Sequence, residues 1–133
     1  MVAIRAKPHG GDGKDRGIIL LLDDSTSKRT ARAKLLMRRG LSVEVAGTVE
    51  HARELWRPGR YLIVLIAVHK DIRRATEFCD EIQEKHPDQI VGVLVPINRP
   101  WPRTHCRSLL WPEENLEYFL ARVETLADFA RAA

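Results

Sequence analysis

Two uninterrupted apolar runs constrain the fold of this chain more than any other feature of its sequence. The first, "IILLL" at residues 18–22, is followed by two aspartates, and the second, "YLIVLIAV" at residues 61–68, is followed by His69 and further polar residues. Short runs of this kind are typical of strands that are covered on both faces. Strands covered on both faces belong to parallel sheets with helices on each side, so the runs predict an α/β domain.

Segments with helical spacing alternate with strands along nearly the whole chain. Helices are expected at residues 25–40, 48–56 and 74–86, and from Pro112 onward. Further strands are expected at residues 41–46 ("LSVEVA"), 90–95 ("IVGVLV") and 108–111 ("SLLW"). Because crossovers between parallel strands are right-handed, this order predicts one doubly wound parallel sheet with helices on both faces.

The length and composition fit one globular domain, expected to span residues 17–133, since 44% of the 133 residues are hydrophobic. Residues 1–16, with three glycines beside Pro8, show no periodicity and are expected to form a flexible leader. The longest apolar run has eight residues, and a membrane-spanning helix needs roughly 20. Cys79 and Cys106 match no metal spacing and are too few for a disulfide framework, so we expect reduced thiols and a cytoplasmic protein.

The positive charge of the chain is concentrated in the first predicted helix. The net charge is +4, and residues 25–40 alone contain six basic residues and no acidic one. Such a helix can be a solvated face whose long side chains cover apolar surface. It can also be a surface that meets a negatively charged partner. Nucleic acid is the weaker choice of partner, because no recognition helix, zinc pattern or aromatic-basic strand motif accompanies the charges.

Motifs between residues 17 and 130 follow one another in a distinctive order. Five apolar residues precede the pair Asp23–Asp24, and Gly40 comes sixteen residues after Asp24. The segment "EFCDEIQEKHPDQIVGVLV" follows later, and Trp111–Pro112 ends the last predicted strand. In this order and spacing the sequence resembles a response-regulator receiver domain, the flavodoxin-like module of two-component signalling. The long segment is similar to the third helix, His-Pro-Asp turn and fourth strand of many receivers, and Trp111–Pro112 stands where the family has a Lys-Pro pair.

The resemblance implies a flavodoxin-like sheet of five parallel strands. It also implies that the fourth helix is shortened or missing, because the stretch before the fifth strand is shorter than usual and contains Pro96, Pro100 and Pro102. In the family, a kinase histidine passes a phosphoryl group to an aspartate at the end of the third strand. Two acids after the first strand hold Mg²⁺, and a Thr or Ser and a Lys at the ends of the fourth and fifth strands complete the site.

Carried over position by position, the resemblance keeps the acidic pair Asp23 and Asp24 but loses the rest of this site. The phosphoacceptor position falls on Ala67, the Thr/Ser position on Val95 and the Lys position on Trp111. Alanine has no oxygen to receive a phosphoryl group, valine cannot hydrogen-bond a phosphate, and tryptophan cannot neutralise one. We therefore expect a pseudo-receiver with no catalytic residues and no cofactor, in which the acidic pair is a vestigial site for weakly bound Mg²⁺ at most.

The acidic pair has other interpretations as well. Asp23 and Asp24 can hydrogen-bond the loop before the first helix without binding any cation. With His69 they could hold a transition metal, although one imidazole without spaced partners is usually a surface histidine. A hydrolase triplet of Ser25, His69 and Asp23 has no elbow motif to support it, so we do not expect an enzyme.

The resemblance implies a regulatory module that binds a signalling protein without being phosphorylated. The expected partner-binding residues lie mainly on the basic helix, which in receivers borders the kinase-docking surface: Lys28, Arg29, Arg32, Arg38, Arg39 and Trp111. Trp111 can instead pack over the vacated pocket, its apolar area replacing a charge. Receivers often dimerise, so the resemblance allows a homodimer, and we expect no membrane contact. The alternative function is a nucleic-acid-binding accessory protein that uses the basic leader and first helix.

Overall fold

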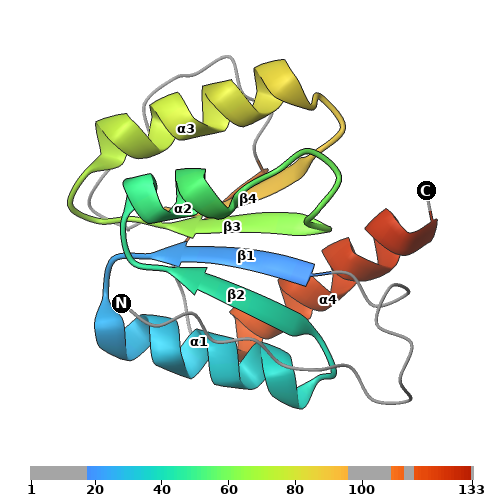
Figure 1. The fold of residues 1–133 in the computed structure, drawn as a ribbon. Helices are drawn as coiled ribbons and strands as arrows, with labels where there is room; N and C mark the ends of the chain where they lie inside the picture. Colours follow the sequence, from blue (N-terminus) through green and yellow to red (C-terminus); the bar gives the residue numbers. More distant parts are fainter. Residues whose placement is uncertain (1–17, 96–108, 113–115, 133) are drawn as a thin grey trace.

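The computed structural model describes residues 18–95, 109–112 and 116–132 of the chain (Figure 1). In chain order its elements are β1 (Ile18–Asp23), α1 (Thr26–Arg38), β2 (Ser42–Ala46), α2 (Val49–Leu55), β3 (Ile63–Ala67), α3 (Ile72–Lys85), β4 (Ile90–Val95), β5 (Leu109–Pro112) and α4 (Leu116–Ala132). The predicted leader lies outside the described residues. So does the stretch at residues 96–108, where the resemblance expects a shortened or missing helix.

The five strands form one parallel sheet, which confirms the predicted fold class. Their order across the sheet is β2-β1-β3-β4-β5, so the chain crosses over β1 between β2 and β3. The register pairs Leu21 of β1 with Val45 on one side and Leu65 on the other. Because all strands run the same way, their carboxyl ends lie together at one end of the sheet, where functional groups of such folds gather.

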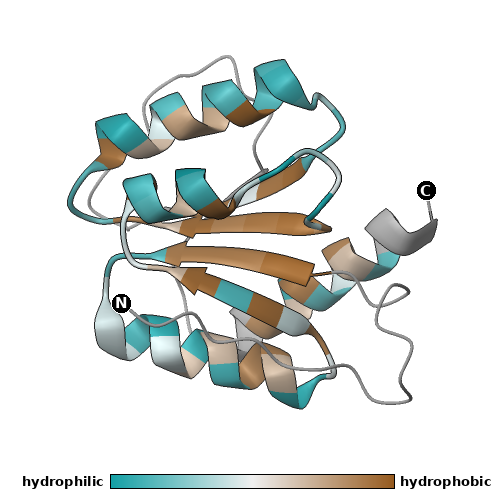
Figure 2. Cartoon of the chain, in the orientation of Figure 1, coloured by the Kyte–Doolittle hydropathy of each residue, from teal (hydrophilic) through white to brown (hydrophobic). Residues whose placement is uncertain are grey.

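Helices cover both faces of the sheet and enclose two hydrophobic cores. Figure 1 shows α1 and α4 on one face and α2 and α3 on the other. Alternate residues of β1 serve the two cores: Ile19 and Leu21 face α1 and α4, whereas Leu20 and Leu22 pack with Phe78 of α3. Figure 2 shows the same arrangement as apolar strands between helices that are polar on their outer sides. Fully burying each such side chain stabilises the fold by about 1.5–3 kcal/mol.

The ends of α1 follow from local sequence signals. Ser25 is the N-cap, and its side-chain oxygen accepts a hydrogen bond from the N–H of Lys28 at 3.4 Å. At the other end, Gly40 has a φ of 82°, a left-handed conformation that a residue with a side chain rarely adopts. The predicted start and stop of this helix are therefore confirmed.

The sequence predicts that Pro112 begins the last helix, and this prediction is wrong. This proline lies beside Val95 of β4, and α4 begins at Leu116. Proline occurs mainly in edge strands and at strand ends, and Pro112 is the last residue of β5, the last strand in the sheet order. Among the helices of the described segments, none combines the length and apolar character that crossing a membrane requires.

Candidate functional site

The carboxyl ends of β1 and β3 lie side by side at the candidate site. Asp23 is the last residue of β1, Ala67 is the last residue of β3, and the two are register partners. Ala67 is completely buried, and its methyl group belongs to the core under α1 and α4. The position that the resemblance assigns to the phosphoacceptor thus carries a buried methyl beside a carboxylate.

The other two positions that the resemblance assigns to the phosphate site lie within the last two residues of their strands. Val95 is the last residue of β4, and Trp111 lies in β5 beside Leu94. The two roles considered for the Trp111 side chain, as a cover over the pocket or as an exposed anchor, fall outside what the structure describes.

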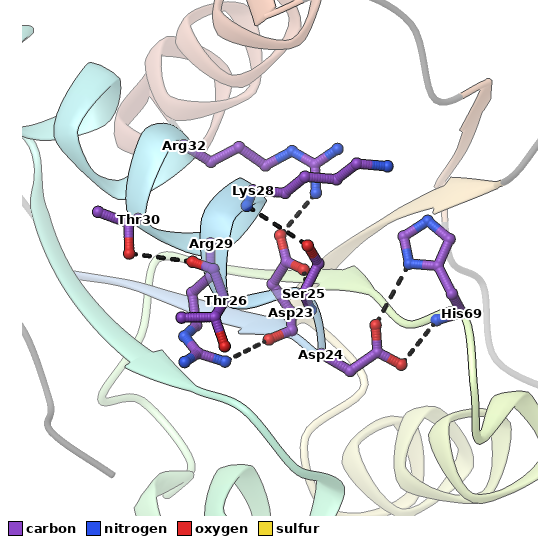
Figure 3. A network of polar contacts seen from close by, with 9 residues as sticks. All are labelled: Asp23, Asp24, Ser25, Thr26, Lys28, Arg29, Thr30, Arg32 and His69. Carbon is purple, nitrogen blue, oxygen red and sulfur yellow. Dashed lines mark hydrogen bonds and ion pairs between the residues drawn. The ribbon is translucent and has the colours of Figure 1, made fainter.

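Asp23 is buried and is neutralised by an arginine from the neighbouring helix. Its Oδ1 accepts a hydrogen bond from the N–H of Ser25 at 2.9 Å, and its Oδ2 accepts one from Nη1 of Arg32 at 2.6 Å (Figure 3). The side chain of Asp23 is 0% exposed and that of Arg32 is 3% exposed. Burial raises the pKa of Asp23, and the Ser25 amide and the Arg32 guanidinium act against that shift. Arg29 adds a bond from its Nη1 to the main-chain oxygen of Asp23 at 2.9 Å.

Asp24 ties the loop after β1 to the loop after β3. Its Oδ2 accepts hydrogen bonds from the backbone N–H groups of His69 and Lys70, at 2.9 and 2.8 Å. Its Oδ1 lies 3.2 Å from Nδ1 of the His69 ring, as Figure 3 shows. Burial alone would raise the pKa of Asp24, but the bonds from Lys70 and His69 outweigh it, so the pKa lies below its usual value.

All four carboxylate oxygens of the acidic pair therefore have polar partners in the protein itself. The two neighbouring carboxylates use different partners. Asp23 is bound by Ser25, the cap of α1, and by Arg32 within α1, whereas Asp24 is bound by the loop between β3 and α3. A Mg²⁺ ion would need several of these oxygens turned toward one point. The described segments contain no group of three or more His, Cys, Asp or Glu side chains arranged to hold a metal ion.

The structure separates the members of the hypothetical hydrolase triplet. His69 lies against Asp24 and not against Asp23, and Asp23 is bonded to the backbone of Ser25. The Ser25 side chain accepts from the N–H of Lys28, in the manner of a helix cap. These contacts are those of a loop that is fixed in place, and they do not form a nucleophile–base–acid chain.

Arg32 does not lie on a docking surface, so that part of the sequence interpretation is wrong. Lys28, Arg38 and Arg39 are exposed and Arg29 is half-buried, but Arg32 points inward to Asp23. A signal for this was present in the sequence, because Arg32 is four residues before the buried Leu36 and so shares its side of the helix. We missed it because arginine is usually exposed unless it is paired.

A small pocket opens beside the acidic pair, between the loops that follow β2 and β3. It has a volume of about 260 Å³, and Asp24, Thr48, Glu50 and Lys70 are among the residues that line it. Both oxygens of Asp24 are already engaged by His69 and Lys70. The carboxylate in the pocket wall is therefore held in place, and its lowered pKa keeps it ionised.

Solved structures of receiver domains share this fold. The non-phosphorylated HemR receiver domain of Leptospira biflexa superposes with a TM-score of 0.73 at 21% identity, covering 84% of this chain and 94% of that one. CheY4, a chemotaxis response regulator of Vibrio cholerae, superposes with a TM-score of 0.69 at 19% identity, covering 83% of this chain and 98% of that one. HP1043, an orphan response regulator of H. pylori, has a TM-score of 0.66 at 19% identity, and the match covers 84% of this chain and 96% of that one. No protein-family model and no curated protein matches the sequence. The chain thus has the fold of response-regulator receiver domains.

Proposed function

We propose that this chain is a receiver-like regulatory module whose shape is set by internal contacts and not by phosphorylation. The observation that supports this most is the engagement of all four oxygens of Asp23 and Asp24 by polar groups of the protein, beside the buried methyl of Ala67. Contacts of this kind hold the two loops in one arrangement whether or not a phosphoryl donor is present.

The chemistry of the site supports the same proposal. Phosphoryl transfer to a receiver produces an acyl phosphate, which needs a reachable carboxylate as the nucleophile. Ala67 offers none, and the carboxylate of Asp23 is 0% exposed. Asp24 is partly exposed, but its oxygens are held by the amides of His69 and Lys70. We infer that the module is not an enzyme and works without a cofactor.

The outer face of α1 is the surface that we propose for partner binding. Lys28, Lys34, Arg38 and Arg39 are exposed there, and α1 contains no acidic residue. Arg39 also reaches Glu124 of α4 at 3.5 Å. A row of cations on one helix favours a partner with an acidic surface and speeds the approach of such a partner. We infer that the partner is a signalling protein.

The absence of a phosphate switch can be tested on the wild-type chain. Beryllofluoride with Mg²⁺ mimics the phosphoryl group, and it should leave the NMR signals of the backbone amides of Asp23, Asp24 and Ala67 unchanged. A receiver that has an aspartate at the acceptor position serves as the positive control. Shifts centred on these residues, or an adduct of phosphate mass on either aspartate after incubation with acetyl phosphate, would contradict the proposal.

The proposed surface can be tested with a pair of matched charge reversals. Arg38→Glu changes the basic face of α1, and Arg73→Glu makes the same change on α3, on the other side of the sheet, where the Arg73 side chain is 91% exposed. A protein captured by the wild type should be lost with Arg38→Glu and retained with Arg73→Glu. Equal retention by both variants would exclude this face, and recovery of nuclease-sensitive material would favour the nucleic-acid alternative.

A further inference from the structure

Arg29 belongs to the helix that we propose for docking, and it also holds the end of β1. The residue is half-buried on α1, and its Nη1 donates to the main-chain oxygen of Asp23 at 2.9 Å (Figure 3). That oxygen belongs to the peptide group that joins Asp23 to Asp24. A guanidinium has several N–H donors, so Arg29 can keep this bond while it binds a carboxylate of a partner.

Asp24 continues this contact to the loop between β3 and α3. Its Oδ2 accepts hydrogen bonds from the backbone N–H groups of His69 and Lys70, 45 and 46 residues along the chain. Figure 1 shows the start of α1 and the loop before α3 at the same end of the sheet. His69 and Lys70 lie outside the helices and strands, so the carboxylate supplies the acceptor that secondary structure supplies elsewhere.

The same loop forms one wall of the pocket beside the acidic pair. Lys70 and Asp71 line the pocket from this loop, and Thr48 and Glu50 line it from the start of α2. A shift of the β3–α3 loop therefore changes the shape of the pocket.

We propose that Arg29, Asp23 and Asp24 form a chain of contacts through which a partner docked on α1 restrains the β3–α3 loop and the pocket beside it. This inference rests on the proposed function, which places the partner on α1, and it adds where the effect of docking is felt. Loops of this kind open locally, without unfolding of the whole domain. A partner that fixes the Arg29 side chain makes this opening rarer, because the anchor of the loop is then already ordered.

Amide hydrogen exchange of the full chain, followed by NMR without a partner, tests the chain of contacts. Arg29→Met keeps a long side chain but removes the donor to Asp23, so the amides of His69 and Lys70 should exchange roughly two- to tenfold faster. Lys34→Met removes the same charge from an exposed position of α1, and it should leave these two amides unchanged. Arg29→Lys keeps a donor of similar reach and should restore most of the protection.

A double variant shows whether the effect passes through Asp24. In Asp24→Asn the loop has already lost its anchor, so adding Arg29→Met should not change the exchange of the His69 and Lys70 amides further. The inference fails if Arg29→Met has the same effect on these amides with and without Asp24, or if it has none in the wild-type background. It also fails if they exchange as slowly as the sheet amides of Leu21 and Leu65, since the loop would then open only with the whole domain.

These outcomes are distinct from a failure of the proposed function. The exchange measurements contain no partner and no phosphoryl donor, so they can fail while the wild type still gives no response to beryllofluoride. Failure of the proposed function appears instead as such a response, or as equal capture of a partner by Arg38→Glu and Arg73→Glu.

Discussion

Two adjacent aspartates in this structure have opposite electrostatic environments. Burial raises the pKa of Asp23 in spite of its contacts with Ser25 and Arg32. The pKa of Asp24 is lowered, because bonds from Lys70 and His69 outweigh its lesser burial. The same functional group therefore contributes differently to stability at two neighbouring positions, and only Asp24 favours folding through its ionisation.

Replacing Asp24 by asparagine should loosen the connection between the loops after β1 and β3. The amide keeps one acceptor but places an NH₂ group against backbone N–H donors, which should lower the free energy of unfolding at neutral pH by about 1–3 kcal/mol. The folded pKa of Asp24 lies below its ordinary 3.8, so its contribution is present above pH 3.8 and is lost as the pH falls through the folded value.

Urea unfolding from neutral to acidic pH measures both effects of Asp24→Asn. The difference in stability between wild type and variant should shrink as the pH falls below 3.8. Asp71→Asn serves as the control, because Asp71 is exposed and makes no side-chain cap bond. If Asp71→Asn lowered the free energy of unfolding as much as Asp24→Asn, the role that we assign to Asp24 would be contradicted.

Tyr61 forms a second buried polar contact, at the other end of β3. Its hydroxyl lies 2.5 Å from Oε1 of Glu44, and Arg60 donates to the other carboxylate oxygen of Glu44 at 2.8 Å. Burial and the bond to Glu44 raise the pKa of Tyr61 to about 12, from an ordinary value of 10.0. A raised pKa means that the protonated hydroxyl stabilises the folded chain, and that this contribution disappears as the pH rises through the folded value.

The alkaline stability of Tyr61→Phe tests this contact. Between pH 10.0 and about 12 the wild type should lose about 2 kcal/mol of unfolding free energy through Tyr61, because the unfolded phenol ionises first. The variant should be less stable than the wild type at neutral pH and should lack this part of the alkaline slope. Identical slopes for the two proteins in urea titrations would show that Tyr61 is not held as described.

Among the elements, α2 depends most on contacts outside itself. It has seven residues, fewer than a helix needs to be stable alone in water. The Thr48 side chain caps its start by accepting from the N–H of His51 at 3.1 Å. Arg53 donates two bonds to Glu81 of α3, at 3.0 and 2.7 Å. A second ion pair, between Glu50 and Arg74, joins the same two helices.

Removing the two helix caps should therefore have unequal effects. Thr48→Ala should cost about 1 kcal/mol, since a short helix cannot easily replace a lost cap. Ser25→Ala should cost less, because the Ser25 bond is longer, at 3.4 Å, and α1 has 13 residues. Chemical denaturation of the two variants gives the comparison. A larger loss of unfolding free energy in Ser25→Ala than in Thr48→Ala would show that α2 does not depend on its Thr48 cap.

For the whole molecule, the separation of charge is the feature that most affects its encounters. Helix α1, which has exposed cations and no acidic residue, lies on one face of the sheet, and α2 and α3 lie on the other (Figure 1). Basic side chains of α2 and α3 pair with acids of the same two helices. A field of this kind depends on where the charges lie as well as on their sum. Two variants with the same net charge should therefore behave differently toward a negatively charged surface.

Cation-exchange chromatography distinguishes an effect of where the charges lie from an effect of the net charge. Arg38→Glu should elute at lower salt than Arg73→Glu, although the two have equal net charge, because only the first interrupts the face of α1. Circular dichroism should show both to be folded, since both side chains are exposed. Elution of the two variants at the same salt concentration would mean that only the net charge, and not its position on the surface, determines binding to the resin.

The sheet was predictable from the sequence, whereas the contacts at its carboxyl end were only partly so. Apolar runs such as residues 18–22 report burial directly, since a strand between two helical layers has no polar face. The spacing of Arg32 to Leu36 hinted at its burial, but the partners of Arg32 and Glu44 were not visible, because folding brings Asp23 to one and Tyr61 to the other. Alternation in "LSVEVA" predicted β2 correctly but gave no sign that its polar residues are also buried.

The pairing of Arg32 with Asp23 bears on how a chain like this can change over generations. An aspartate at position 67 would bring a third carboxylate to a place where Arg32 already pairs with Asp23. A single loss of Arg32 would strand a buried anion. Both substitutions disturb the same ion pair, so their effects on stability should not add. The pair thus restricts which side chains the neighbouring strand end can accept.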